Sequence, residues 1–228
     1  MNDHSQRNTR ALLEVKDLTL YFPRQQRAAV QRVSFSIPSG STLGLVGGSG
    51  AGKSSIARLV MRLIEADAGE ILYRGTDIAK MDTRQLFRYR QNVQIVFQEP
   101  SASLSPRRTV QQTLLEPLKH FVIGDAEHRR QKIRETLSTV GLDDTTLQRY
   151  PHQLSSGQQQ RVAIARALVS DPELVIADEA VASLDVSIQA QILQLIRSLQ
   201  DERGIAFLFI SHDLGVIRQI ADQVGVMY

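Results

Sequence analysis

The sequence contains no cysteine among its 228 residues. Disulfide bonds and cysteine-ligated metal sites are therefore excluded, and the cytosol is the default compartment. No stretch reaches the roughly 18 to 20 apolar residues that a membrane-spanning helix needs, and the polar start MNDHSQRNTR does not fit a secretory signal peptide. Hydrophobic residues make up 42% of the chain, which is enough for the core of one large domain or of one domain with an inserted subdomain.

The chain also lacks a strong excess of either charge, because its formal net charge is only +3. A nucleic-acid-binding face needs clustered basic residues, so this balance predicts no nucleic-acid partner. The densest basic groups are interpreted as solvated helix faces or as contact points for another chain. They are Arg84, Arg88 and Arg90, then Arg107 and Arg108, then Arg129, Arg130, Lys132 and Arg134.

One glycine-rich stretch, residues 47–55, fits the phosphate-binding pattern G-x-x-x-x-G-K-[ST]. The apolar run TLGLV precedes it, and apolar residues at helical spacing follow it, so it lies between a predicted strand and a predicted helix. Backbone N–H groups of such a loop and of the helix start bind phosphate oxygens. Lys53 can reach the β- and γ-phosphates, and the Ser54 hydroxyl can ligate Mg²⁺. The loop residues are Gly47, Gly48, Ser49, Gly50, Ala51, Gly52, Lys53, Ser54 and Ser55.

The remaining patterns predict an α/β fold. Alternating apolar residues between 13 and 20 and between 33 and 37 predict half-exposed antiparallel strands. Strands that alternate with helices elsewhere predict a mainly parallel sheet. Residues 109–120 and 126–140 read as helices of an insertion, and residues 101–108 as a polar loop, because Pro100 forbids a helix continuing from there. We therefore expect a flexible tail at 1–11, a core at 12–98 and 166–228, and a helical insertion at about 99–165.

Polar residues follow three of the predicted strands, where ligands bind in parallel sheets. Asp178 could hold Mg²⁺, and the adjacent Glu179 could orient and deprotonate an attacking water, although an acidic helix cap is the plainer alternative. Gln98 could be a further Mg²⁺ ligand and sense the γ-phosphate. His212 is placed to contact the γ-phosphate or the water, although a lone histidine is usually a packed or surface ring.

Two further features point to nucleotide contacts. The segment LSSGQ, residues 154–158, opens a helix and is a second anion-binding N-terminus, which indicates that the nucleotide of a partner chain is its target. Tyr21 and Phe22 end the first strand, where an aromatic ring either packs or stacks on a base.

Together these motifs resemble the ATP-binding subunit of an ABC transporter, from about residue 12 to the end. The resemblance implies a P-loop NTPase fold, ATP and Mg²⁺ as ligands, and a head-to-tail dimer with two ATP molecules between the subunits. Phe22 would stack on adenine, with Tyr21 as the alternative. The residues acting on the partner's nucleotide would be Ser155, Ser156, Gly157, Gln158 and, in a loop that crosses the interface, Asp185.

Longer stretches, FQEPSASLSPR, YPHQLSSGQQQRVAIARAL and ADEAVASLDVSIQAQIL, are similar to the oligopeptide, dipeptide, glutathione and nickel uptake group. This implies an ATPase on the cytoplasmic side of the inner membrane that works as a homodimer or heterodimer. It would power import through two permeases fed by a periplasmic or extracellular binding protein. The alternatives are an ABC ATPase of translation or DNA maintenance, and a silent subunit. ABC ATPases of translation or DNA maintenance usually have paired domains or long coiled-coil insertions, and neither is seen in these residues. A catalytically silent subunit is disfavoured because Lys53 and Glu179 are intact.

Three positions depart from that group's usual pattern. Ser156 replaces a glycine, the order Ala182-Ser183 replaces Ser-Ala, and Gly48 replaces a glutamate. The first two could alter dimer closure. The chain ends at Tyr228, before the C-terminal extension typical of the group, which leaves open whether it is shortened.

Overall fold

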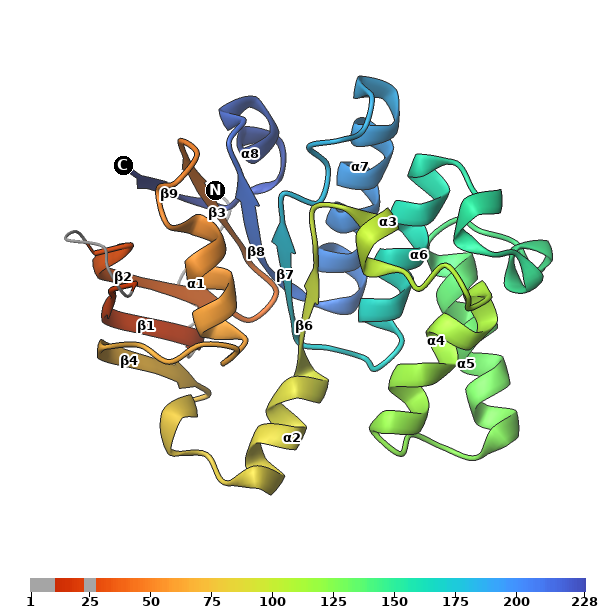
Figure 1. The fold of residues 1–228 in the computed structure, drawn as a ribbon, viewed down its shortest axis with the longest axis horizontal. Helices are drawn as coiled ribbons and strands as arrows, with labels where there is room; N and C mark the ends of the chain where they lie inside the picture. Colours follow the sequence, from red (N-terminus) through yellow and green to blue (C-terminus); the bar gives the residue numbers. More distant parts are fainter. Residues whose placement is uncertain (1–10, 23–27) are drawn as a thin grey trace, which may run out of the picture.

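The computed structural model of the chain describes residues 11–22 and 28–228. Two sheets lie side by side, and a group of helices extends to one side of the larger sheet (Figure 1). The predicted flexible tail lies outside the described residues except for Ala11, which begins strand β1. No helix in these two ranges is both long and apolar enough to cross a bilayer.

The N-terminal sheet is antiparallel, with strand order β2-β1-β4-β5. Its strands are β1 (Ala11–Leu20), β2 (Val30–Pro38), β4 (Ala68–Tyr73) and β5 (Thr76–Asp77). The predicted antiparallel pairing of the first two strands is confirmed, with Val15 opposite Phe35 and Leu18 opposite Val33. Apolar side chains from β1 face one core, which explains the alternating sequence pattern.

The second sheet is entirely parallel, with order β6-β7-β8-β3-β9. Its strands are β6 (Val93–Val96), β7 (Leu174–Asp178), β8 (Ala206–Ser211), β3 (Thr42–Gly47) and β9 (Gln223–Met227). The central strand β8 is buried along its whole length, because both faces of a parallel sheet are covered. Phe207 and Phe209 join one core, while Leu208 and Ile210 join the other.

Helices cover both faces of the parallel sheet. Helix α1 (Lys53–Val60) packs between the two sheets, in one core with β1 and with one face of β3 and β8. Helices α7 (Val186–Arg203) and α8 (Leu214–Ile220) contribute to the core on the opposite face. The short 3-10 helix η1 (Ile78–Lys80) and helix α2 (Thr83–Asn92) connect β5 to β6 (Figure 1).

The helical group contains α4 (Val110–His120), α5 (Ala126–Thr139), the 3-10 helices η2 (Asp144–Gln148) and η3 (Pro151–Gln153), and α6 (Ser156–Leu168). The single helix α6 passes through the predicted boundary at residue 165. The prediction of a polar loop over 101–108 was wrong at its start, because helix α3 (Pro100–Ser103) lies there. Proline blocks a helix from continuing through it, but it fits the first helical position, where no intrahelical N–H bond is needed.

Candidate functional site

A cleft of about 1390 Å³ opens at the edge of the parallel sheet where its strands end. The phosphate-binding loop forms its floor, and segments from distant parts of the chain form its walls. The sheet edge explains this gathering, because the carboxyl ends of parallel strands meet there. The cleft is lined by Phe22, Ala28, Ala29, Gly48, Ser49, Gly50, Ala51, Gly52, Lys53, Ser54, Ser55, Gln98, Glu179, Met227 and Tyr228.

Two glycines of the loop allow close contacts with neighbouring backbone. Gly52 has a φ of 90°, and a Cβ there would collide with the carbonyl oxygen of Ala29. A Cβ at Gly47 would collide with the carbonyl oxygen of Met227. In contrast, no atom of residues 11–22 or 28–228 lies within 4 Å of a Cβ placed at Gly48. Glycine is therefore required at Gly47 and Gly52 because neighbouring backbone oxygens approach too closely for a side chain, and at Gly52 also because its φ is positive.

Lys53 begins helix α1 and is buried, with 5% of its surface exposed. Its ammonium donates hydrogen bonds to the carbonyl oxygens of Gly47 and Gly48, both at 2.8 Å. An ammonium group has three N–H donors and no acceptor. The side chain therefore lies inside the curl of the loop, where a phosphate oxygen would replace or join these carbonyl partners.

Ser54 and Asp178 join the loop to the end of β7. The Ser54 hydroxyl donates to Asp178 Oδ1 at 3.1 Å. Burial is the main cause that raises the pKa of Asp178, and the nearby Glu179 charge adds to it. The bond from Ser54 and the charges of Arg58 and Lys53 act in the opposite direction. The carboxylate is therefore held where a cation would offset its lost hydration.

This pair fits a magnesium ion by the chemistry of its donors. A hydroxyl and a carboxylate oxygen are hard ligands, and Mg²⁺ commonly takes only one or two protein oxygens together with water and phosphate. Among the described residues, no three His, Cys, Asp or Glu side chains gather as a metal site. The hydroxyl and carboxylate of Ser54 and Asp178 suit an ion that also takes phosphate and water oxygens as ligands. Gln98 is exposed and lines the same cleft.

Glu179 follows Asp178 in an unusual backbone conformation, with a φ of 50°. Its N–H donates to the carbonyl oxygen of Ile210 at 3.0 Å, which ties it to β8. Its Oε2 lies 3.4 Å from Nδ1 of His212, the residue that follows β8. A left-handed conformation at a non-glycine residue costs energy and turns the side chain out of the strand direction. The structure thereby brings the predicted acid and histidine together at the cleft.

The segment LSSGQ lies away from the lining of this cleft. Ser155 caps α6, with its Oγ accepting from the Gln158 N–H at 3.3 Å and its N–H donating to Gln158 Oε1 at 3.1 Å. A Cβ at Gly157 would lie 2.8 Å from Cγ2 of Ile188 in α7. Ser156, the neighbouring residue, is exposed.

Asp185 lies near LSSGQ because Ile188, in the first turn of α7, packs against Gly157. It caps α7, and its Oδ1 accepts from the Ile188 N–H at 3.0 Å and from the Ser187 hydroxyl at 2.8 Å. These bonds, with the Ile188 N–H first, lower the pKa of Asp185. Of the residues predicted to act on a partner's nucleotide, Ser155, Ser156 and Asp185 are exposed, Gln158 is half-buried and Gly157 is buried.

The structure also distinguishes the two aromatic candidates. Phe22 is half-buried and lines the cleft. Tyr21 is 50% exposed and is absent from that lining, and its N–H donates to Asp67 Oδ2 at 2.7 Å. The sequence interpretation missed Ala29 and Met227, which line the cleft and contact the loop with backbone oxygens. Neither residue type carries a signal for such a role.

Comparisons with known proteins agree with this arrangement. A family model described as ABC transporter matches residues 30–182. The oligopeptide transport ATP-binding protein AppF of Bacillus subtilis is 47% identical to the chain, covering 97% of this chain and 70% of AppF. The oligopeptide transport ATP-binding protein OppF of the same organism is 46% identical, covering 96% of this chain and 73% of OppF.

Solved structures show the same architecture. The cbiO1 protein of Clostridium perfringens, described as part of the ABC transporter complex cbiONQ, superposes with a TM-score of 0.85 at 27% identity, covering 95% of this chain and 84% of that chain. The ATP-binding cassette MJ0796, in a dimeric post-hydrolysis state bound to ADP and Pi, gives a TM-score of 0.83 at 29% identity, covering 94% of both chains. The family match, these relatives and the loop geometry show that the chain belongs to the ABC transporter family, as an ATP-binding subunit that hydrolyses ATP.

Proposed function

We propose that this subunit hydrolyses MgATP in the cleft to power the import of oligopeptides through partner permeases. The observation that carries the site is the convergence of Lys53, Ser54, Asp178 and Glu179 on one edge of the sheet. The cargo class rests on the relatives of 42–47% identity, which are named as oligopeptide transport ATP-binding proteins. Those names favour transport over a role in translation or DNA maintenance.

The binding residues follow from the geometry of the loop. N–H groups along residues 47–55 hold the phosphates, and Lys53 turns from the loop carbonyls toward the β- and γ-phosphates. Ser54 and Asp178 would hold Mg²⁺, and Gln98 would be a further ligand that also contacts the γ-phosphate. When bound, Mg²⁺ supplies charge neutralisation at the phosphates. Phe22 stacks on the adenine ring at the open side of the cleft.

The catalytic residues act on water at the end of β7 and β8. Glu179 orients the attacking water and accepts its proton, while the water oxygen bonds to the γ-phosphorus and the bond to the β–γ bridging oxygen breaks. ADP and phosphate are the products. His212, 3.4 Å from the Glu179 carboxylate, holds that carboxylate and contacts the γ-phosphate.

A second ATPase subunit, identical or different, completes the site. Ser155, Ser156, Gly157 and Gln158 of each subunit cover the nucleotide of the other, and Asp185 contacts the opposite subunit. Support comes from the exposed positions of Ser155, Ser156 and Asp185 outside the lining of the chain's own cleft. The related cassette MJ0796 is described as dimeric.

Two membrane permeases are the proposed partners of the helical insertion, at about residues 99–165, and of the adjoining core. Apolar side chains are exposed there: Phe97 at 40%, Phe87 at 37% and Val122 at 75%. Phe87 also packs edge-to-face with Phe121 at 5.3 Å, which joins α2 to the end of α4. The subunit would therefore bind at the cytoplasmic side of the membrane, and a solute-binding protein would deliver the peptide on the other side.

The test is reconstitution with two permeases and a solute-binding protein in proteoliposomes. We expect an added oligopeptide to accelerate ATP hydrolysis and to accumulate inside the vesicles. The variant Ser155→Arg should abolish hydrolysis while ATP still binds, because the arginine blocks the opposite site. Ser138→Arg, at an exposed serine of α5, is the matched control. Full activity of Ser155→Arg with a monomeric ATP complex would contradict the shared site, and hydrolysis that ignores peptide would contradict the cargo.

A further inference from the structure

Strand β9 forms both the edge of the parallel sheet and a wall of the nucleotide cleft. It pairs with β3, and Met227 lies opposite Gly47 at the start of the phosphate-binding loop. The Met227 carbonyl oxygen fills the space that a side chain at Gly47 would need. Val224 and Val226 of β9 are 46% and 66% exposed within the described residues. Besides the pairing with β3, polar side-chain contacts hold the start of this strand.

Thr42 and Asp222 make those contacts at the opposite end of the two strands. The Thr42 N–H donates to Asp222 Oδ2 at 2.8 Å, and the Asp222 N–H donates to the Thr42 carbonyl oxygen at 2.9 Å. Both residues directly precede the first paired positions, Leu43 and Gln223. The two bonds thus set the alignment of β9 on β3 before the ladder begins.

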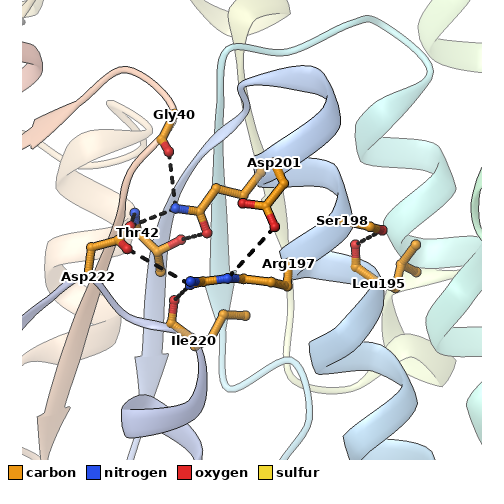
Figure 2. Close-up of polar contacts among 9 residues, drawn as sticks. Gly40, Thr42, Leu195, Arg197, Ser198, Asp201, Ile220 and Asp222 are labelled. Atoms are coloured by element: carbon orange, nitrogen blue, oxygen red, sulfur yellow. Dashed lines mark hydrogen bonds and ion pairs between the residues drawn. The ribbon is translucent and has the colours of Figure 1, made fainter. Parts of the chain in front are cut away.

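Gln200 of α7 holds this pair in place. Its side chain is only 7% exposed. Its Oε1 accepts from the Thr42 hydroxyl at 3.2 Å, and its Nε2 donates to the Gly40 carbonyl oxygen at 3.0 Å and to Asp222 Oδ2 at 2.6 Å. Figure 2 shows its three partners, Gly40, Thr42 and Asp222, close together near the start of β3. Both N–H donors of the amide are used, which fixes its orientation.

Arg197 flanks the network from the outside. Its guanidinium donates to the Ile220 carbonyl oxygen at 3.3 Å and lies 3.9 Å from Asp222 Oδ1. The arginine side chain is 49% exposed, so this ion pair contributes little. Of the two described side chains that contact the Asp222 carboxylate, Gln200 is the buried one and Arg197 the exposed one.

We infer that Gln200 is a positioning residue for nucleotide binding, acting through Thr42 and Asp222 on β9. The inference rests on the proposed nucleotide site. A strand that slips by one residue reverses its faces, so a β9 released from this network no longer holds its Met227 carbonyl against Gly47. The fraction of chains with a formed phosphate loop then falls, and the apparent Kd for ATP rises in proportion. Glu179 and His212 follow other strands and keep their places.

The test compares Gln200→Met with Ser198→Ala in the full chain. Methionine keeps the length of the side chain and removes its hydrogen bonds. Ser198 is on the same helix, and within the described residues its hydroxyl bonds to the Leu195 carbonyl oxygen of α7 at 2.9 Å and to no part of this network, which makes it a matched control (Figure 2). For Gln200→Met we expect the Kd of a non-hydrolysable MgATP analogue to rise about threefold to tenfold. The kcat at saturating ATP should stay within about twofold, and amide exchange should accelerate in β9.

An unchanged Kd in folded Gln200→Met, or an equal rise in Ser198→Ala, would overturn the inference. If Gln200→Met does not fold, Thr42→Val removes only the hydroxyl contact to Gln200 and keeps both backbone bonds to Asp222. The same direction of change is then expected, and its absence overturns the inference. Failure of the unaltered chain to bind the analogue would instead contradict the proposed nucleotide site itself.

Discussion

The Glu179 carboxylate and the His212 ring lie 3.4 Å apart, between Oε2 and Nδ1. They follow the neighbouring parallel strands β7 and β8, and Glu179 has a positive φ of 50°. Only 18% of the Glu179 side chain is exposed, whereas 58% of the His212 side chain is. The carboxylate is therefore the inner member of the pair and the histidine the outer one.

The first prediction concerns this inner carboxylate. Glu179→Gln keeps the shape of the side chain but cannot accept a proton, so ATP hydrolysis should fall by at least about 100-fold, the usual contribution of general-base catalysis. ATP-dependent dimer formation should persist, since the phosphate loop is untouched. Steady-state phosphate release and light scattering with ATP measure the two effects. Undiminished hydrolysis would remove Glu179 from its proposed role.

The second prediction follows from the raised pKa of Asp178. A carboxyl group whose pKa is raised by folding favours the folded chain when protonated, so its contribution is lost as pH rises from the ordinary value of roughly 4 through the raised one. Asp178→Asn removes the destabilisation by the buried charge, because an asparagine side chain does not ionise. Without nucleotide, the variant should melt at a higher temperature than the parent at pH 7, and the difference should shrink toward pH 4.

With magnesium and ATP, we expect Asp178 to stabilise the chain instead of destabilising it. MgATP should raise the melting temperature of the parent chain more than that of Asp178→Asn, because the ion offsets the buried charge. Thermal melts with ATP plus magnesium and with ATP plus a chelator separate the contribution of the ion. Equal stabilisation of both proteins by magnesium would show that Asp178 does not hold it.

The third prediction compares the effects on stability of substituting Gly157 and Ser156 in LSSGQ. Gly157→Ala adds a Cβ 2.8 Å from the stiff Ile188 side chain, which costs about 1 to 3 kcal/mol. This outweighs the gain of up to about 1 kcal/mol in helix propensity. Ser156→Ala, at an exposed position, should change stability by less than about 0.5 kcal/mol. Urea unfolding measures both. Equal effects would mean that α6 and α7 are not in contact at Gly157.

The fourth prediction concerns Gln160, which is fully buried in α6. Within the described parts of the chain, neither atom of its side-chain amide has a hydrogen-bond partner. Leaving such groups unpaired costs roughly 1 to 3 kcal/mol, so Gln160→Met should increase the free energy of unfolding by a similar amount. Differential scanning calorimetry provides the measurement. A lower melting temperature would show instead that the amide is paired, for example by an ordered water molecule.

Much of the site could be predicted because its signals are local. The spacing of Gly47, Gly52 and Lys53 fixes a loop whatever the rest of the chain does, and apolar runs before Asp178 and His212 place both residues at strand ends. Chain topology then brings them together, since parallel strands end at one edge. The local pattern and the tertiary arrangement agree at these positions.

Other features depend on tertiary contacts that leave no local pattern. Gln200 is a polar residue near the end of an amphipathic helix, and its buried role follows only from the approach of Thr42 and Asp222. The backbone oxygens of Ala29 and Met227 could come from any residue type. At Pro100 the residue type was informative but ambiguous, because proline both ends helices and begins them.

The bond between Ser54 and Asp178 joins residues that are 124 positions apart in the chain. A polypeptide still emerging from the ribosome has its phosphate loop long before it has β7, so the proposed Mg²⁺ site between them does not yet exist. Under this proposal, full-strength MgATP binding begins only when the second half of the sheet has docked. Since a ligand that binds only the native chain shifts folding by mass action, cellular ATP would stabilise completed subunits and leave unfinished ones exposed to proteolysis.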